Sequence, residues 1–154
     1  RPVRLMTILV DTSILARLAN TADADYESTA RAVLALHRRG ESLSVAPQNL
    51  IEFRSVATRP TTVNGLGLSA ADTESVVNAF ETAFPLLPET PDIYPTWKRV
   101  VQTAGVLGKQ VYDARLVAIC HVYGVTHVLT FNVQHFARFA SIAPGLIVVD
   151  PATL

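Results

Sequence analysis

The sequence of 154 residues contains a single cysteine, Cys120. One cysteine can form neither an internal disulfide framework nor a metal cluster built on several cysteine ligands. Such sparing use of cysteine fits a reducing environment, in which structural disulfides are rare. We therefore expect a cytoplasmic protein whose stability comes from a hydrophobic core, and 49% of its residues are hydrophobic.

The chain also lacks an excess of charge of either sign. Lysine and arginine together number 13, as do aspartate and glutamate, and the isoelectric point is near 7.1. The overall charge therefore does not mark a nucleic-acid-binding protein, although a local basic patch could be hidden within a neutral average. No apolar run reaches the roughly 18 residues that a membrane span requires, so we expect no membrane contact.

Repeats, low-complexity segments and interdomain linkers are absent too. A chain of this length usually forms one domain, and we expect that domain to cover residues 6–154. No signal peptide is recognisable at the start of the sequence. Met6 fits a natural start, with residues 1–5 as tag or upstream sequence.

Several common catalytic signatures are missing. The GLG at 65–67 lacks the strand and helix that a phosphate-binding glycine loop needs, and no G-x-S-x-G nucleophile elbow occurs. The four histidines do not have the spacing of metal ligands. The sequence therefore argues against dinucleotide binding, serine-hydrolase chemistry and a zinc site.

What the sequence does contain is an alternation of short apolar strands with helices. Thr7–Val10 is an apolar run typical of a buried parallel strand, and further strands are expected at 42–46, 126–131 and 146–149. Helices are expected at about 12–18, 25–38, 47–58, 70–83, 91–103 and 113–123. We predict an α/β fold with three α/β/α layers around a central parallel sheet.

Local signals suggest where some elements begin and end. Thr12 and Ser13 could cap the first helix, and Thr90 followed by Pro91 resembles the start of another. Residues 106–111 are expected to form a loop. After Phe131 we expect a polar turn.

Three acidic residues stand at the ends of these elements or among apolar neighbours. Asp11 ends the first strand, Glu52 lies on the helix after the second strand, and Asp113 begins an almost wholly apolar helix. Parallel strands place their carboxyl ends at one edge of a sheet. We therefore expect the three carboxylates to meet at that edge.

Taken singly, each acid has an ordinary explanation. Asp113 could complement the helix dipole, Glu52 could be a solvated helix residue and Asp11 could be a helix cap. Together, however, three converging carboxylates repel one another unless a cation neutralises them. Oxygen ligands without cysteine or clustered histidine favour Mg²⁺ or Mn²⁺.

The motifs around these acids resemble those of PIN-domain ribonucleases, and most closely the VapC-type toxins of bacterial toxin–antitoxin pairs. The resemblance spans Met6 to the C-terminus. It rests on four blocks in order: ILVDTSILARL (8–18), NLIEFRSVATRP (49–60), GKQVYDARLVA (108–118) and LTFNVQHFARF (129–139).

This resemblance implies a PIN-like parallel-sheet domain that cleaves RNA with a metal, a cognate antitoxin and a homodimer. By motif position, Asp11, Glu52 and Asp113 fall on the family's first three acids, and Asn132 falls where an acid or asparagine is common. Many relatives carry aspartate where this chain has His135, so the chain departs from the pattern there.

On this hypothesis, Asp11 and Asp113 hold one or two Mg²⁺ ions and Glu52 binds a second ion or orients a metal-activated water that hydrolyses the phosphodiester. Asn132 would add a neutral oxygen. Candidate contacts to the RNA follow from proximity to the acids in the sequence, although each could instead be a surface residue, a cap or a local ion-pair partner: Ser13, Arg17, Arg54, Lys109, Arg115 and His135.

Two alternatives stay open at this point. A haloacid-dehalogenase-like phosphatase also begins with an acid after the first strand, but it normally has a second aspartate two residues later, where this chain has Ser13. A PIN-like binding module, acting only through a protein partner, would need no metal site.

Overall fold

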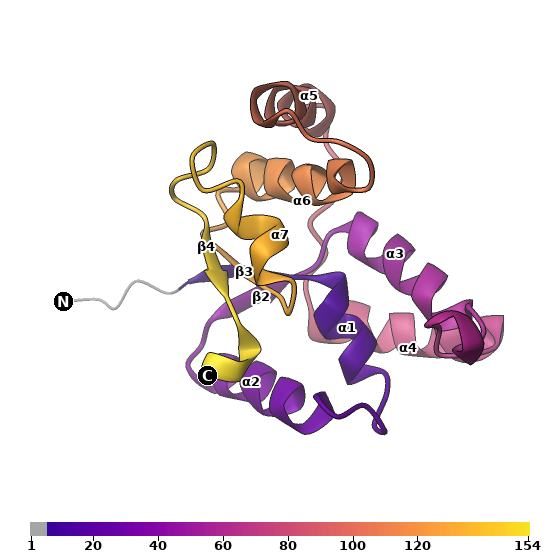
Figure 1. The fold of residues 1–154 in the computed structure, drawn as a ribbon. Helices are drawn as coiled ribbons and strands as arrows, with labels where there is room; N and C mark the ends of the chain where they lie inside the picture. Colours follow the sequence, from indigo (N-terminus) through magenta and orange to yellow (C-terminus); the bar gives the residue numbers. More distant parts are fainter. Residues whose placement is uncertain (1–5) are drawn as a thin grey trace.

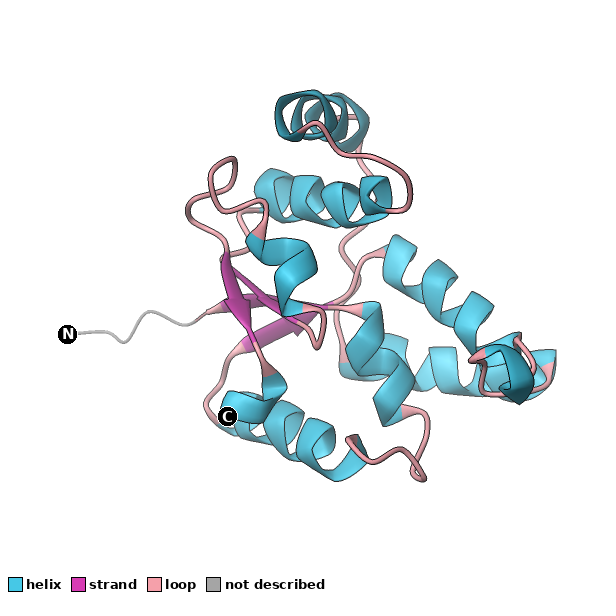
Figure 2. Ribbon diagram, viewed as in Figure 1, coloured by secondary structure: helices cyan, strands magenta, loops and turns pink. Residues whose placement is uncertain are grey.

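The computed structural model describes residues 6–154, which contain one sheet of four parallel strands. The strands are β1 (Thr7–Val10), β2 (Ser42–Ser44), β3 (His127–Leu129) and β4 (Ile147–Val149), in the order β2-β1-β3-β4 (Figures 1 and 2). Helices cover both faces of the sheet, which confirms the predicted three-layer α/β/α fold. The expected tag or upstream residues 1–5 lie outside the described part of the chain.

The helices divide between two layers, with α5, α6 and α7 on one side of the sheet and α1 and α2 on the other (Figure 1). Their bounds are α1 (Thr12–Leu18), α2 (Tyr26–Arg38), α3 (Pro47–Thr58), α4 (Ala70–Ala83), α5 (Ile93–Ala104), α6 (Gln110–Tyr123) and α7 (Val133–Ala137). Two short 3-10 helices follow α3 and β4, η1 (Thr61–Val63) and η2 (Pro151–Thr153). Within residues 6–154, no helix is both long enough and apolar enough to cross a membrane.

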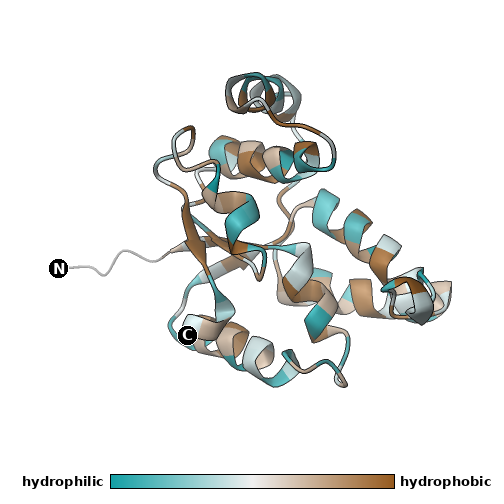
Figure 3. Cartoon of the chain, viewed as in Figure 1, coloured by the Kyte–Doolittle hydropathy of each residue, from teal (hydrophilic) through white to brown (hydrophobic). Residues whose placement is uncertain are grey.

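The central strand β1 is apolar at successive positions because it packs on both sides. Ile8 and Val10 belong to a core shared with α1, α2, α3 and α4, while Leu9 belongs to a second core shared with α5, α6 and α7. Strands β1 and β4 are mostly hydrophobic, whereas β2 has a serine on either side of Leu43 and the helices carry many polar residues (Figure 3). Cys120 is buried in the second core, and this burial raises the pKa of its thiol to about 12. It is therefore a packing residue, as its apolar helix predicts.

Pairing of β1 with β3 brings the residues after both strands together. Val10 lies opposite Leu129, and the N–H of Asp11 donates to the Leu129 carbonyl over 3.0 Å. Asp11 and Thr130 are therefore neighbours although 119 positions separate them in the sequence. This edge of the sheet is where the candidate site lies.

Several predicted boundaries are wrong. Helix α6 begins at Gln110 instead of Asp113, because Gly108 adopts a positive φ of 59° that closes a turn directly before it. Helix α5 begins only at Ile93, since Thr90 begins a turn that the Ile93 N–H closes and its hydroxyl caps nothing. The polar turn expected after Phe131 contains the short helix α7.

The loop after α3 folds back along the last turn of that helix. Backbone N–H groups of residues 66–68 donate to the carbonyls of Val56, Arg59 and Ala57 over 2.8 to 3.0 Å. Gly65 lies so close to Arg59 that an added Cβ would overlap the Arg59 carbonyl group. This position does not have a positive φ, so its backbone conformation does not require glycine. Glycine is needed because there is no space for a Cβ.

We expect Gly65→Ala to destabilise the protein by about 1–3 kcal/mol, because the added methyl group would force the loop away from α3. Gly145→Ala is the matched control, since a Cβ at Gly145 meets no atom within 4 Å. Urea unfolding of both variants measures the difference. Equal midpoints for Gly65→Ala and Gly145→Ala would show that the loop does not pack as described.

Candidate metal centre

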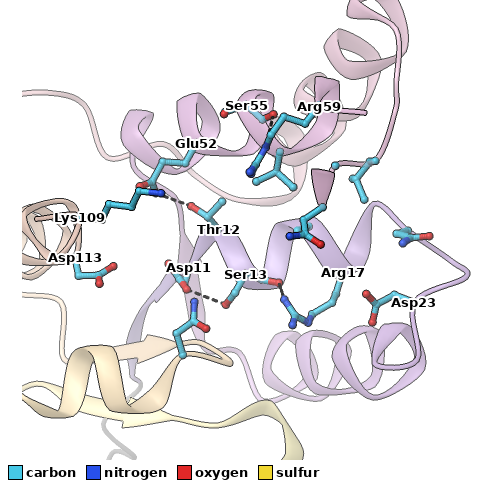
Figure 4. A pocket seen from close by; sticks show the side chains of 17 residues that line it. Asp11, Thr12, Ser13, Arg17, Asp23, Glu52, Ser55, Arg59, Lys109 and Asp113 are labelled. Atoms are coloured by element: carbon cyan, nitrogen blue, oxygen red, sulfur yellow. Dashed lines mark hydrogen bonds between the residues drawn. The ribbon is translucent and has the colours of Figure 1, made fainter. Parts of the chain in front are cut away.

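A cleft opens at the carboxyl edge of the sheet, over the faces of α1 and α3 (Figure 4). Its volume is about 890 Å³. The walls include the acids Asp11, Glu52 and Asp113 together with Asn132. The structure thus brings four separate segments of the chain, and all four predicted catalytic residues, to one cavity.

Asp11 is held by two hydroxyl donors at one of its oxygens. The hydroxyl of Ser13 donates to Asp11 Oδ2 over 2.8 Å, and that of Thr130 donates to the same atom over 2.7 Å. The N–H of Phe131 in turn donates to Ser13 Oγ over 3.1 Å, and that of Asn132 to Thr130 Oγ1 over 2.9 Å. Within residues 6–154, Asp11 Oδ1 accepts no hydrogen bond. A carboxylate that is only 4% exposed is therefore fixed on one side and available on the other.

The prediction that Thr12 and Ser13 cap α1 is wrong. Asp11 occupies the N-cap position, and no side chain caps the helix there. Both hydroxyls donate to carboxylates instead: that of Thr12 to Glu52 and that of Ser13 to Asp11.

Glu52 is oriented by a relay of polar side chains that starts in the core. The Asn49 side chain is fully buried, accepts the N–H of the residue preceding α3 over 2.9 Å, and donates to Thr12 Oγ1 over 3.4 Å. Thr12 then donates to Glu52 Oε1 over 2.8 Å, and Gln48 Nε2 lies 3.5 Å from Oε2. Burial raises the pKa of Glu52, these two hydrogen bonds lower it, and the charge of Asp11 raises it further.

Asp113 projects from the first turn of α6, and its side chain is 24% exposed. Burial raises its pKa from an ordinary 3.8 to about 6. The charge of His135, whose Nδ1 lies 3.6 Å from Asp113 Oδ2, lowers the pKa, while the charges of Asp11 and Glu52 raise it. The three acids are therefore close enough to repel one another, and His135 supplies a neighbouring partner for Asp113.

The donor chemistry of the cleft fits a hard divalent cation. All candidate ligand atoms are oxygens, which suit Mg²⁺ or Mn²⁺. In the part of the chain that the structure describes, no three His, Cys, Asp or Glu side chains form a group tight enough to surround one ion. Mg²⁺ is usually bound by one or two carboxylates, with water and phosphate oxygens completing its shell. The separated acids fit that mode better than an all-protein cage.

Two of the predicted RNA-binding cations line the cleft, Arg17 and Lys109. The guanidinium of Arg17 lies over the Phe131 ring at 4.3 Å and donates to the Ser13 carbonyl over 3.0 Å. Its Nε is buried and makes no hydrogen bond among the described residues, but it lies 3.8 Å from Asp25 Oδ2 in an ion pair. Arg17 therefore has a fixed orientation. Lys109 is exposed at the start of α6.

The other two predicted cations, Arg54 and Arg115, do not line the cleft. Each lies two positions after an acid on a helix, and a step of two residues turns the side chain by about 200°. Arg54 pairs with Glu74 over 2.9 Å on the outer side of α3. Arg115 pairs with Glu89 over 2.7 Å and donates to Gln48 Oε1 over 3.2 Å. It therefore helps to position Gln48, which lies beside Glu52.

Three residues that position the acids have no recognisable sequence motif: Thr130, Asn49 and Gln48. Thr130 looks like an ordinary strand residue, and Gln48 like a solvated helix residue. One signal was available for Asn49: it stands in the first turn of the helix, one turn before Glu52, and is followed by the apolar residues Leu50 and Ile51. An asparagine buried in such a place requires hydrogen-bond partners.

Solved structures share this fold at low sequence identity. VapBC2 from Rickettsia felis, bound to a DNA fragment from its promoter, gives a TM-score of 0.67 at 14% identity over 94% of this chain and 98% of that chain. A toxin–antitoxin complex from Klebsiella pneumoniae gives 0.63 at 19% identity over 94% and 98%. VapC20 from Mycobacterium tuberculosis, a toxin that cleaves the sarcin-ricin loop, gives 0.61 at 18% identity over 85% and 94%.

Comparison with curated proteins finds no match to the chain. The model of the PIN domain family, however, matches residues 8–142, a span that includes all the acids of the cleft and Asn132. The match covers most of the described fold, from β1 to the loop before β4. The chain belongs to the PIN domain family.

Proposed function

We propose that the protein is a metal-dependent endoribonuclease. The observation that carries this proposal is the single cleft in which Asp11, Glu52, Asp113 and Asn132 meet at the carboxyl edge of a PIN-domain sheet. A haloacid-dehalogenase-like phosphatase fits less well, because the residue two positions after Asp11 is Ser13, whose hydroxyl is bound to Asp11 itself.

In this proposal, Asp11 and Asp113 hold Mg²⁺, with Mn²⁺ as a substitute, and Glu52 binds a second ion or orients water. When bound, the ion supplies Lewis-acid activation of water and offsets charge on the scissile phosphate. Ser13 and Thr130 keep the free oxygen of Asp11 turned toward the cleft. Asn132 adds a neutral oxygen acceptor, so the site carries no fourth carboxylate.

Arg17 is the best-supported contact to the RNA backbone. Its stacking on Phe131 and its hydrogen bond to the Ser13 carbonyl fix the guanidinium plane, and its Nη2 makes no hydrogen bond within residues 6–154. A phosphate oxygen in the cleft would satisfy that donor. Lys109 lies at the cleft rim and adds a second positive charge. Ser13 and His135 act on the acids and are weaker candidates for RNA contact.

The biological role we propose is that of a toxin in a toxin–antitoxin pair. Support comes from the fold shared with VapBC2 of Rickettsia felis, with VapBC of Salmonella typhimurium and with the Klebsiella pneumoniae complex. The proposal includes a cognate antitoxin, a homodimer and a cytoplasmic location.

Asp113→Asn is expected to lower RNA cleavage in Mg²⁺ by at least about 100-fold, because loss of a direct ligand should exceed the 10- to 100-fold effect typical of outer-shell changes. Cleavage is measured with the purified protein on bulk RNA, beside growth arrest on induction of the chain alone. Asp92→Asn is the control, since Asp92 is exposed and outside the cleft. Full activity in Asp113→Asn would refute the nuclease proposal. Absence of Mg²⁺ or Mn²⁺ binding at millimolar concentration, measured by calorimetry, would favour a binding module.

Thr130→Val is expected to weaken metal affinity and RNA cleavage by roughly 10- to 100-fold, the usual effect of losing a hydrogen bond that orients a ligand. Thr130→Ser keeps the hydroxyl and should retain most of both. Calorimetric titration with Mn²⁺ and the RNA cleavage rate give two independent measurements. Equal losses in the two variants would show that Thr130 matters for packing rather than for orienting Asp11.

The stability of the metal-free protein should fall as the pH rises from about 4 to about 7. The raised pKa of Asp113 means that its protonated form favours the folded state, so this contribution is fully present below its ordinary pKa and is lost as the pH passes about 6. The expected loss is on the order of 3 kcal/mol at about 1.4 kcal/mol per pKa unit. Urea unfolding in EDTA at several pH values measures it. Asp113→Asn should flatten this dependence and Asp92→Asn should not; an unchanged slope in Asp113→Asn would contradict the raised pKa.

A further inference from the structure

The cleft continues well beyond the acids. Its far end is formed by the ends of α1 and α3 and by the loop that follows α3 (Figure 4). Side chains of Asn20, Arg59 and Asn64 line this end, together with Ser55 and Gly65. A volume of about 890 Å³ is near the upper limit of the roughly 300–1,000 Å³ usual for ligand sites, so it leaves room for more than a phosphate group.

Two rows of helical side chains connect the acidic end to the far end. Both rows have the three- and four-residue spacing of one helix face. The row on α3 runs through Glu52, Ser55, Val56 and Arg59, and the row on α1 and the residue pair after it runs through Ser13, Ala16, Arg17 and Asn20. At about 1.5 Å per residue, Arg59 lies roughly 10 Å along the helix from Glu52. That separation places the far end beyond the scissile phosphate, beside a neighbouring nucleotide.

The far end presents hydrogen-bond donors that the protein leaves unused. Asn20 Oδ1 accepts the Ala22 N–H over 3.2 Å, which turns the amide NH₂ outward from that bond. Arg59 donates through Nε to the Ser55 carbonyl over 3.3 Å, and within residues 6–154 it forms no ion pair. The terminal nitrogens of its guanidinium are thus available to a ligand.

Asn64 is placed in the same cavity by a tight turn. It is the only non-glycine residue with a positive φ, 61°, among those described. The N–H groups of Val63 and Gly65 on either side both donate to the Pro60 carbonyl over 3.0 Å. The Asn64 amide makes no side-chain hydrogen bond within residues 6–154, so the turn holds it in place while its donors and acceptor stay free.

We propose that this far end, formed by Asn20, Arg59 and Asn64, is a subsite for one unpaired nucleobase of the RNA, next to the cleaved phosphate. The proposal rests on the proposed nuclease function. Amide groups and an arginine are the side chains that read base edges in single-stranded RNA. A second phosphate would suit this end poorly, because the carboxylate of Asp23 also lines it.

The donors and the acceptor in this subsite favour guanine. The terminal nitrogens of an arginine can donate two hydrogen bonds to guanine, one to O6 and one to N7. This pair is the commonest base-specific contact in nucleic-acid complexes. Asp23 uses Oδ1 to accept the Asp25 N–H over 2.8 Å, and its Oδ2 can accept the guanine amino group. Uracil lacks the amino group, and adenine lacks the O6 acceptor.

The test uses short oligouridines that carry a single guanosine, adenosine or cytidine. The wild-type protein should cleave the guanosine substrate at one fixed distance from that base and roughly 10- to 100-fold faster than plain oligouridine, the range expected of one bidentate base contact. Asn20→Ala and Arg59→Ala should remove this preference, so that the guanosine substrate and plain oligouridine are cleaved at equal rates. Asn78→Ala and Arg39→Ala, exposed residues outside the cleft, are the matched controls.

Binding of the same oligonucleotides to the Asp113→Asn protein, followed by fluorescence anisotropy, separates the subsite from the nuclease. Cleavage without a base preference, or with a preference unchanged in Asn20→Ala and Arg59→Ala, overturns the subsite and leaves the nuclease in place. No cleavage, but a guanosine preference in binding that both variants remove, supports the subsite and overturns the nuclease. Neither cleavage nor a preference in binding overturns both.

Discussion

The parallel pairing of β1 with β3 is the constraint on which the rest of the site depends. It sets Val10 opposite Leu129, so that Asp11 and Thr130 leave the sheet side by side. One strand then supplies the carboxylate and the other supplies a hydroxyl to orient it. Because both strands are buried on both faces, neither can shift its register without exposing core residues. The geometry of Asp11 is therefore as rigid as the sheet itself.

The acids impose a cost that the surrounding structure only partly offsets. Burial and mutual repulsion disfavour the charged forms of Glu52 and Asp113, as the raised pKa of each shows. Neutral donors such as Thr12 reduce that cost, and His135 offers Asp113 a positive charge when it is protonated. Electrostatic destabilisation of this kind is common where a site must attract a cation strongly, because the charges that bind the cation also reduce the stability of the folded protein.

The fold and the acids were predictable for different reasons. The sequence predicted a parallel sheet but not the order of its strands. A parallel sheet alone was enough to place Asp11, Glu52 and Asp113 at one edge, where the structure has them. The likeness to PIN-domain motifs added Asn132, which no spacing rule would have selected.

What escaped prediction was decided by three-dimensional packing. Arg54 and Arg115 are near the acids in sequence, yet helical geometry turns them to the other side. Thr130 gains its role only from a strand partner 119 positions away. Asn64 reaches the cleft because a loop folds back on α3, and the sequence shows only a glycine-containing connection there.

That loop has a consequence for how such a protein could change its target. Residues 66–68 are hydrogen-bonded to α3 through backbone groups, and the side chains of Leu66 and Leu68 pack against the core. The side chains of Asn20 and Arg59 take no part in these bonds, so replacing them need not alter the path of the chain. The reactive end of the cleft is built into the sheet, whereas the far end is carried on a helix terminus and a backbone-anchored turn. One scaffold could thus acquire a new recognition surface by substitution there while its chemistry stays intact.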